Sequence, residues 1–247
     1  MKIFSIINHK GGVAKTTSVQ NIAAGLAEKK HRVLMIDLDP QANLTKGFGI
    51  FKAEKNIYHT FSENIDLPVI EVKKNLSIVP SSIDFAGIEI EISNKLARER
   101  ILQNHLAKLN GQYDYCFLDC PPSLGLITIN AMVAANEVII PLEAEFYAFQ
   151  GLDSIFKVIQ DVKVAINPNI TVKGVFLTKV KERRSITSAI RDEIKKHLGD
   201  LLLETEIREN VAIVESQANG MDIFQYDKNC NGAKDYKKLI TELLKRN

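Results

Sequence analysis

The sequence predicts an α/β fold, a doubly wound and mainly parallel sheet with helices on both faces. Short apolar runs alternate with helical patterns from one end of the chain to the other. This alternation is typical of βαβ units, whose parallel strands are buried on both faces. A glycine-rich segment follows the first apolar run, and aspartates end two later runs. These positions predict a ligand site at the carboxyl edge of the sheet.

The apolar runs and the helical periodicity assign the elements in order. The expected strands are residues 2–7, 33–37, 76–80, 114–119, 137–141, 172–178 and 202–207. Helices are expected where apolar residues recur every three or four positions. They are residues 16–30, 96–109, 126–135, 148–165, 185–198 and 233–245. Residues 40–75 are less regular and predict a mobile loop with a short helix. No low-complexity linker or repeat interrupts the pattern, so residues 1–247 are expected to form a single domain.

Composition excludes several classes of protein. An apolar content of 45% and a charged content of 25% are ordinary for a soluble globular chain. The net charge of +2 is too small to indicate nucleic-acid binding, so any basic surface must be local. Cys116, Cys120 and Cys230 form no Cys-x-x-Cys pair, which fits a reducing cytoplasm and argues against an iron–sulfur carrier. With no signal peptide and no long apolar stretch, we expect no stable membrane insertion.

The segment after the first apolar run has the layout of a phosphate-binding loop. Residues 8–17 read Asn-His-Lys-Gly-Gly-Val-Ala-Lys-Thr-Thr, and the helical pattern follows at once. In such a loop, backbone N–H groups and the helix N-terminus surround a polyphosphate, and a lysine adds a point charge. This context argues against a plain glycine-rich turn. We predict a nucleoside-triphosphate site in which Lys15 contacts phosphate and the Thr16 hydroxyl reaches Mg²⁺.

Carboxylates at strand ends complete the predicted site. Asp37 and Asp39 follow one apolar run, and Asp119 follows another. The carboxyl ends of parallel strands meet where the phosphate loop lies, so these three side chains should converge. Asp119 has the context of a residue that holds Mg²⁺ through water, and Asp37 is a second candidate ligand. Each could instead start a turn or cap a helix.

The loop resembles the deviant Walker A motif of the ParA/Soj partition ATPases and MinD. That signature is Lys-Gly-Gly-x-Gly-Lys-Thr-Thr, and this chain carries Lys10-Gly11-Gly12-Val13-Ala14-Lys15-Thr16-Thr17. The resemblance implies a deviant P-loop NTPase in which these eight residues bind ATP with Mg²⁺. Ala14 stands where the family has glycine, which permits close approach of the backbone to phosphate. Hydrolysis is expected to be slow, and we expect Ala14 to lower its rate further without preventing ATP binding.

Other segments extend the resemblance over essentially the whole chain. Asp37-Leu-Asp39-Pro-Gln resembles the family's first switch, and Asp119-Cys-Pro-Pro resembles the second. The similarity continues at Pro141 with Glu143-Ala-Glu-Phe-Tyr-Ala, at Asn210-Val, and at Asn231-Gly-Ala. It implies that Asp39 orients the attacking water and that Lys15 neutralises phosphate in cis. Lys10 would reach across an ATP-sandwiched homodimer to the partner's phosphates.

A local excess of basic residues raises the question of a nucleic-acid partner. Residues 171–200 carry eight Lys or Arg against four acidic residues. A solvated helix face would also explain this pattern. Because the sequence resembles ParA, which binds DNA without sequence preference, we predict DNA contacts here and nearby. The candidates are Lys181, Arg184, Arg191, Lys195 and Arg208.

The sequence therefore predicts a partition ATPase. It would dimerise around ATP, bind double-stranded DNA non-specifically, and be released when a ParB/Spo0J-like partner stimulates hydrolysis. Such a protein would be cytoplasmic and nucleoid-associated, and its cargo could be a chromosome, a plasmid or a protein cluster. The alternative is a MinD-like membrane-associated or cargo-positioning ATPase with an amphipathic C-terminal helix. The apolar stripe on residues 233–245 is expected to pack on the sheet instead. A metabolic ATP-dependent ligase of similar fold is the third hypothesis.

Overall fold

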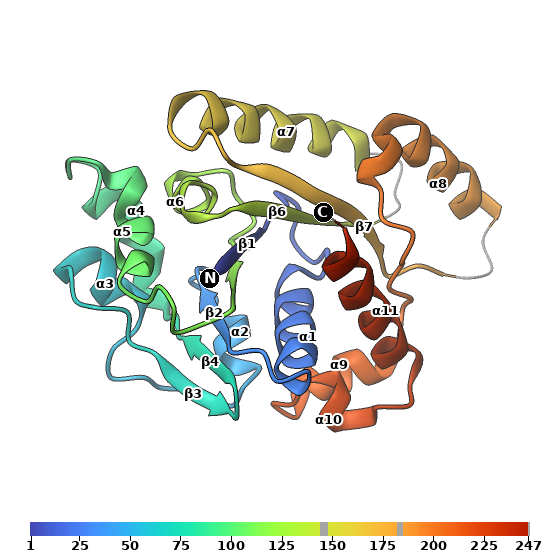
Figure 1. Cartoon of the computed structure of the whole chain (residues 1–247), viewed down its shortest axis with the longest axis horizontal. Coiled ribbons are helices and arrows are strands. Elements are labelled where there is room, and N and C mark those ends of the chain that lie inside the picture. Colours follow the sequence, from blue (N-terminus) through green and yellow to red (C-terminus); the bar gives the residue numbers. More distant parts are fainter. Residues whose placement is uncertain (144–147, 182–184, 247) are drawn as a thin grey trace.

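The computed structural model describes residues 1–143, 148–181 and 185–246, and within them the chain forms one seven-stranded sheet between two layers of helices (Figure 1). The strand order is β3-β4-β2-β5-β1-β6-β7. The bounds are β1 Lys2–Ile6, β2 Val33–Asp37, β3 Ile70–Lys73, β4 Leu76–Val79, β5 Tyr115–Asp119, β6 Glu137–Glu143 and β7 Thr171–Thr178. Only the β3–β4 pair is antiparallel among these strands. The predicted α/β fold with a mainly parallel sheet is confirmed.

The helices divide between the two faces of the sheet. One face carries α1 Lys15–Glu28, α9 Val211–Ala218, α10 Ile223–Asp227 and α11 Asn231–Lys245. The other carries α3 Ile57–Glu63, α4 Ile88–Glu91, α5 Ile101–Ala107, α6 Leu126–Ala134, α7 Ala148–Ala165 and α8 Ser185–Leu198. The short α2, Asn43–Lys46, follows β2. Three 3₁₀ turns cover Ile83–Gly87, Arg98–Arg100 and Gly199–Leu201. Helices therefore cover both faces, as a doubly wound sheet requires.

Alternate residues of the central strands pack into two separate hydrophobic cores, one on each face of the sheet. In β2, Leu34 and Ile36 pack beneath the α3–α8 layer, whereas Val33 and Met35 pack beneath α1 and α11. All four side chains are completely buried. Because side chains of a strand point alternately to the two faces, a strand covered on both sides must be apolar throughout. For this reason the unbroken apolar run at residues 33–36 correctly predicts that β2 is a buried strand.

The strand predicted at residues 202–207 is wrong. In place of a ladder with β7, the described residues form two isolated bridges: Val175 of β7 pairs with Leu202, and Val180, just after β7, pairs with Arg208, just after the segment. Two of its N–H groups bond to a side chain of α11 instead of to a neighbouring strand. Glu242 accepts from the Glu204 and Thr205 N–H groups at 2.8 and 2.9 Å. Leu203 and Ile207 are buried and Leu202 is partly buried, but the segment does not form a continuous ladder with β7.

Smaller differences occur where the sequence is less periodic. The predicted helix 96–109 begins as the 3₁₀ turn at Arg98 and is α-helical only over α5. Within the irregular region 40–75, the structure places α2, α3 and the unpredicted edge strand β3. A two-residue turn joins β3 to β4, and its Asn75 has a φ of 66°. Asparagine adopts this left-handed conformation more readily than most residues, which favours the hairpin.

Candidate functional site

The loop between β1 and α1 is held from the adjoining edge of the sheet. Asn8 is buried; its side-chain amide donates to the Pro141 carbonyl at 2.8 Å and its Oδ1 accepts from the Lys10 N–H at 3.0 Å. The Thr178 hydroxyl donates to the Val13 carbonyl at 3.2 Å. Contacts from β6 and β7 therefore fix both ends of the loop before any ligand binds.

Lys15 is folded back onto this loop. Its ammonium donates to the Lys10 carbonyl at 3.1 Å, and the residue is only 7% exposed. Burial lowers the pKa of Lys15, while the nearby carboxylate of Asp119 opposes that change. The cation lies at the N-terminus of α1, where backbone N–H groups also favour an anion. This arrangement suits a phosphate group.

Two residues of the loop have left-handed backbone conformations. Gly12 has a φ of 79°, and Ala14, the residue before α1, has a φ of 67°. Glycine adopts this conformation freely, whereas a Cβ makes it unfavourable by about 1–2 kcal/mol. The departure from the family motif at Ala14 therefore falls on a position that favours glycine for its backbone geometry.

Asp119, at the end of β5, has no donor for either carboxylate oxygen. The residue is completely buried, and neither oxygen forms a hydrogen bond of good geometry with a described donor. Burial raises the pKa of Asp119 well above its ordinary value and Asp37 raises it further, whereas the nearby Thr16 hydroxyl acts in the opposite direction. A buried carboxylate without donors beside a hydroxyl fits the oxygen ligands that Mg²⁺ prefers.

Water and phosphate oxygens would have to complete that metal site. Among the described residues, no group of three or more His, Cys, Asp and Glu gathers to hold a metal ion. Mg²⁺ usually keeps several waters and binds through one or two carboxylates plus substrate phosphates. The Thr16 hydroxyl and the Asp119 carboxylate therefore fit a magnesium nucleotide better than a metal held by protein ligands alone.

Asp37 ends β2 beside Asp119, but its oxygens are engaged. Its Oδ2 accepts from the Thr45 hydroxyl at 2.6 Å and from the Thr45 N–H at 2.9 Å. Its Oδ1 accepts from the Asp39 N–H at 3.1 Å. Burial raises the pKa of Asp37 to about 6, and these bonds oppose the rise. The contacts hold residues 38–45 against the sheet, while the metal role of Asp37 stays a prediction.

A pocket of about 770 Å³ opens in front of the phosphate loop. Asp39 lies on its wall, and its Oδ1 accepts from the Gln41 N–H at 2.9 Å. The other lining residues are Gly11, Gly12, Ala14, Lys15, Thr16, Thr17, Gln41, Asn43, Lys46, Gly47, Gly49, Phe51, Pro122, Gln217, Ala218, Asn219 and Gly220. The predicted loop and Asp39 thus share one cavity.

Part of this wall has no motif in the sequence. Gln217, in α9, donates to the Thr17 hydroxyl at 3.0 Å. Gln20, in α1, donates to the Gly47 carbonyl at 2.9 Å and to the Met221 carbonyl at 3.1 Å. Two of these bonds join α1 to residues about 200 positions later in the chain. Only tertiary packing reveals this part of the pocket.

Lys10 lies apart from the residues that line the pocket. Its ammonium is 3.6 Å from Oε2 of Glu143, and its side chain is 44% exposed. Lys179, which the sequence reasoning missed, is 4.0 Å from the same oxygen. A Cβ built on Gly12 would meet the Lys179 ammonium at 3.9 Å. The neighbouring Glu145, part of the family-like segment after Pro141, lies outside the described residues.

The candidate DNA-binding residues have different surroundings. Arg208 forms a two-pronged pair with the buried Asp235, at 2.7 and 2.9 Å. Arg191 pairs with Glu206 at 2.5 Å. Lys181 lies 3.3 Å from a carboxylate oxygen of the exposed Glu209, Lys195 is exposed, and Arg184 lies outside the described residues.

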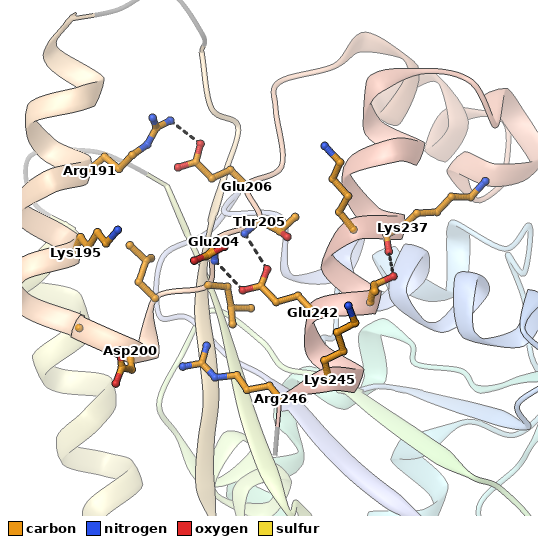
Figure 2. A pocket seen from close by; sticks show the side chains of 15 residues that line it. Arg191, Lys195, Asp200, Glu204, Thr205, Glu206, Lys237, Glu242, Lys245 and Arg246 are labelled. Carbon is orange, nitrogen blue, oxygen red and sulfur yellow. Dashed lines mark hydrogen bonds and ion pairs between the residues drawn. The ribbon is translucent and has the colours of Figure 1, made fainter.

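A broad groove separates α8 from α11 (Figure 2). Its volume of about 1220 Å³ exceeds that of the pocket at the phosphate loop, but none of the loop residues lines it. Six basic side chains and four acidic ones line it, leaving a charge of +2. They are Arg191, Lys195, Lys237, Lys238, Lys245 and Arg246, against Asp200, Glu204, Glu206 and Glu242. The basic contribution of α11 was not predicted.

The apolar face of α11 is already covered. Tyr236, Leu239, Ile240 and Leu243 are buried, whereas Leu244, near the end of the helix, is 41% exposed. The Tyr236 hydroxyl lies 3.3 Å from the Ser18 hydroxyl of α1. The prediction that this helix packs on the sheet is confirmed. In the described part of the chain, no helix has the length and apolar character that crossing a bilayer requires.

Comparison with known proteins identifies the family. A family model described as an AAA domain matches residues 1–172. The sporulation initiation inhibitor protein Soj of Bacillus subtilis is 39% identical over 98% of each chain. The chromosome partitioning protein ParA of Caulobacter vibrioides is 35% identical over 100% of this chain and 95% of its own.

Two solved structures have the same fold over nearly the whole chain. One is cobyrinic acid a,c-diamide synthase of Mycobacterium smegmatis with an ATP analogue and magnesium, with a TM-score of 0.89 and 30% identity, covering 99% of this chain and 94% of its own. The other is a putative plasmid partition protein of Borrelia burgdorferi bound to AMPPNP, with a TM-score of 0.84 and 30% identity, covering 100% and 99%. By its sequence, its fold and its phosphate loop, the chain belongs to the ParA/Soj family of partition ATPases.

Proposed function

We propose that this protein is an ATP-driven DNA-partitioning switch, which pairs around ATP and binds DNA only as that pair. The observation that carries the proposal is the different placement of the two lysines of the loop. Lys15 lines the nucleotide pocket and bonds back to the loop, whereas Lys10 is outside the lining and half-exposed beside Glu143. Lys15 is therefore positioned to bind nucleotide in its own subunit, whereas Lys10 is positioned to contact a site outside its own pocket.

Each residue of the pocket has a role that its surroundings support. Lys15 and the loop N–H groups would hold the phosphates of ATP. The Thr16 hydroxyl and the Asp119 carboxylate would hold Mg²⁺, which neutralises charge on the phosphates when bound. Asp39, on the pocket wall, would orient the attacking water. Asp37 would keep the Asp39 segment in place through its bonds to Thr45 and to the Asp39 N–H.

Lys10 would complete the site of a second subunit. A cation that enters the partner's site stabilises charge on the transferring phosphoryl group, as an arginine finger does in other NTPases. Each subunit of a symmetric homodimer would donate one Lys10 and receive one. Nucleotide state and dimer state would then be linked, because the partner's phosphates give Lys10 its binding site.

The groove between α8 and α11 is the surface that we propose for DNA. Lys195, Lys237, Lys238, Lys245 and Arg246 line it, and the apolar side of α11 anchors that wall against α1. Non-specific binding depends on the number of phosphates neutralised, so pairing two subunits would strengthen it steeply. Arg208 is better assigned to holding Asp235, and Arg191 to holding Glu206.

Hydrolysis would return the pair to single subunits and release the DNA. A ParB/Spo0J-like activator would trigger that step at the cargo, and the protein would be cytoplasmic and associated with the nucleoid. The chromosome partitioning protein ParA and the putative plasmid partition protein among the relatives support a DNA cargo. The covered apolar face of α11 gives a MinD-like membrane role no support.

Retention on duplex DNA tests the proposal. With ATP and Mg²⁺, the protein should bind arbitrary duplexes with an affinity that falls steeply with salt, and with ADP binding should be weak. Replacing Lys195, Lys237 and Lys245 together by Ala should flatten the salt slope and leave pairing intact. As a matched control, Lys29, Lys74 and Lys157, which are exposed lysines outside the groove, would be replaced together by Ala. This variant should bind DNA with the same salt slope as the unmodified protein.

Two other results would contradict the proposal. Flotation of the ATP form with liposomes, without DNA retention, would favour a MinD-like ATPase. ATP turnover that depends on a small-molecule acid, again without DNA retention, would favour a synthase like the structural relative from Mycobacterium smegmatis.

A further inference from the structure

Glu143 ends β6 with one carboxylate oxygen shared between two lysines. Oε2 lies 3.6 Å from the Lys10 ammonium and 4.0 Å from the Lys179 ammonium. The Glu143 side chain is 24% exposed, and each lysine is 44% exposed. A carboxylate that is three-quarters buried requires a cation more than a surface carboxylate does, because water solvates it less well.

Lys179 is held toward the phosphate loop by its backbone. It follows the last residue of β7 and has a φ of 53°, a conformation that is unfavourable for a residue with a Cβ. Its ammonium lies 3.9 Å from the position of a Cβ on Gly12, so it lies close to the loop, although Lys179 does not line the nucleotide pocket. Thr178, the residue before it, donates to the loop carbonyl of Val13. The end of β7 thus fixes both the loop and this third lysine.

The proposed function requires Lys10 to leave Glu143. If Lys10 enters the partner's nucleotide site, Glu143 loses its nearer cation at the moment when ATP brings negative charge to the same loop. An unpaired carboxylate there would oppose pairing of the subunits. Lys179 is already in range of the same oxygen and needs only to close the distance.

We propose that Glu143 and Lys179 form a counter-charge pair that sets how readily ATP-bound subunits associate. When Lys10 leaves Glu143, Lys179 forms the ion pair with that carboxylate. Glu143 therefore has a cationic partner both in the single subunit and in the ATP-bound dimer. Lys179 and Glu143 are positioning residues, and they act through Lys10. The inference rests on the proposed function, because it requires Lys10 to act in the partner subunit.

A double-mutant cycle on dimer affinity tests this inference. Dissociation constants would be measured by sedimentation with AMPPNP and Mg²⁺. Lys179→Met should weaken the dimer by about tenfold, because each dimer contains two Glu143 carboxylates, each three-quarters buried, and both lose a cation. Glu143→Gln should pair as tightly as the unmodified protein or more tightly. The double variant Glu143→Gln with Lys179→Met should match Glu143→Gln within about twofold, since no carboxylate then needs a cation.

A similar charge cluster at the other end of β6 supplies the control. Glu137 lies 3.0 Å from the Lys2 ammonium and 3.5 Å from the Lys173 ammonium. Lys2→Met and Glu137→Gln therefore make the same charge changes far from the loop, and neither should change the dimer affinity. Binding of a fluorescent ATP analogue to dilute, unpaired protein would show that nucleotide affinity is retained in every variant.

The outcomes separate this inference from the proposed function. If Lys179→Met weakens the dimer equally with Glu or Gln at position 143, Lys179 contacts nucleotide or partner directly and the inference is wrong. If Lys179→Met does not change the dimer dissociation constant, Glu143 does not need Lys179 after Lys10 has moved away, and the inference is also wrong. If Lys10→Ala still dimerises on ATP, the proposed function itself fails.

Discussion

Asp37 and Asp119 face each other in register at the ends of neighbouring strands, and only Asp37 has hydrogen-bond donors. Both side chains are completely buried. Asp37 receives three bonds and shapes the segment that carries Asp39, while Asp119 receives none. The two neighbouring aspartates therefore differ in role. Asp37 holds the segment that carries Asp39, whereas Asp119 is available to bind a cation.

The first prediction concerns the stability of the metal-free protein. Asp119→Asn removes a buried charge without donors, so it should raise the free energy of unfolding at pH 7.5 by about 1–3 kcal/mol. The same change should abolish the effect of Mg²⁺ on nucleotide binding. Urea unfolding in EDTA, and nucleotide titrations with and without Mg²⁺, would measure the two effects.

The stability gain should also depend on pH. The folded-state pKa of Asp119 is raised well above the unfolded value of about 3.9, and that of Asp37 is raised to about 6. The folded protein therefore holds protons that the unfolded chain loses, and this contribution to stability declines as the pH rises through the folded-state pKa values. The advantage of Asp119→Asn should be smaller at pH 5 than at pH 7.5. An advantage that grows toward low pH would show that Asp119 is paired in the folded protein.

The second prediction concerns Ala14. Replacement by glycine relieves the left-handed conformation at φ 67° and should stabilise the protein by about 1 kcal/mol. It should also raise ATP turnover, because backbone N–H groups can approach phosphate without a methyl group. Urea unfolding and a phosphate-release assay would report both values. Turnover that stays level or falls would mean that the surrounding backbone has adapted to alanine.

The third prediction distinguishes a structural arginine from a DNA contact. Arg208→Ala leaves Asp235 buried without its two side-chain donors, so the free energy of unfolding should fall by about 1–3 kcal/mol. Lys195→Ala should change it by no more than about 0.5 kcal/mol. Folded Arg208→Ala protein should keep most of its DNA retention. Unchanged stability with lost retention would return Arg208 to the DNA surface that the sequence predicted.

The fourth prediction concerns hydrolysis. Asp39→Ala should leave ATP binding and pairing intact and slow turnover, since the proposed phosphate contacts come from the loop and not from Asp39. Single-turnover hydrolysis would be followed alongside sedimentation with ATP. A turnover rate equal to that of the unmodified protein would move the water-orienting role to another residue.

The sequence predicted those parts of the site that are continuous in the chain. The loop from Lys10 to Thr17 is a single segment, and Asp119 ends an unbroken apolar run, so each is recognisable locally. Gln217 and Lys179 reach the loop only because α9 and β7 fold against it. Nothing near either residue in the sequence indicates that contact.

The errors in the fold have the same origin. Strand β3 is short and half-exposed, with alternating polar residues, and so gave no apolar run. The segment around Leu203 did give one, and Leu203 is indeed buried. The N–H groups of the next two residues, Glu204 and Thr205, bond to the Glu242 side chain of α11, a partner that no local pattern could reveal.

The most direct test of the central claim compares Lys10→Ala with Lys15→Ala. Sedimentation in ATP and Mg²⁺ would be measured beside nucleotide affinity for both variants. Lys15→Ala should lose ATP binding, whereas Lys10→Ala should bind ATP and remain a monomer, because in the proposed function Lys10 acts on the partner's phosphates. A Lys10→Ala protein that binds ATP and still forms dimers as tightly as the unmodified chain would contradict the account.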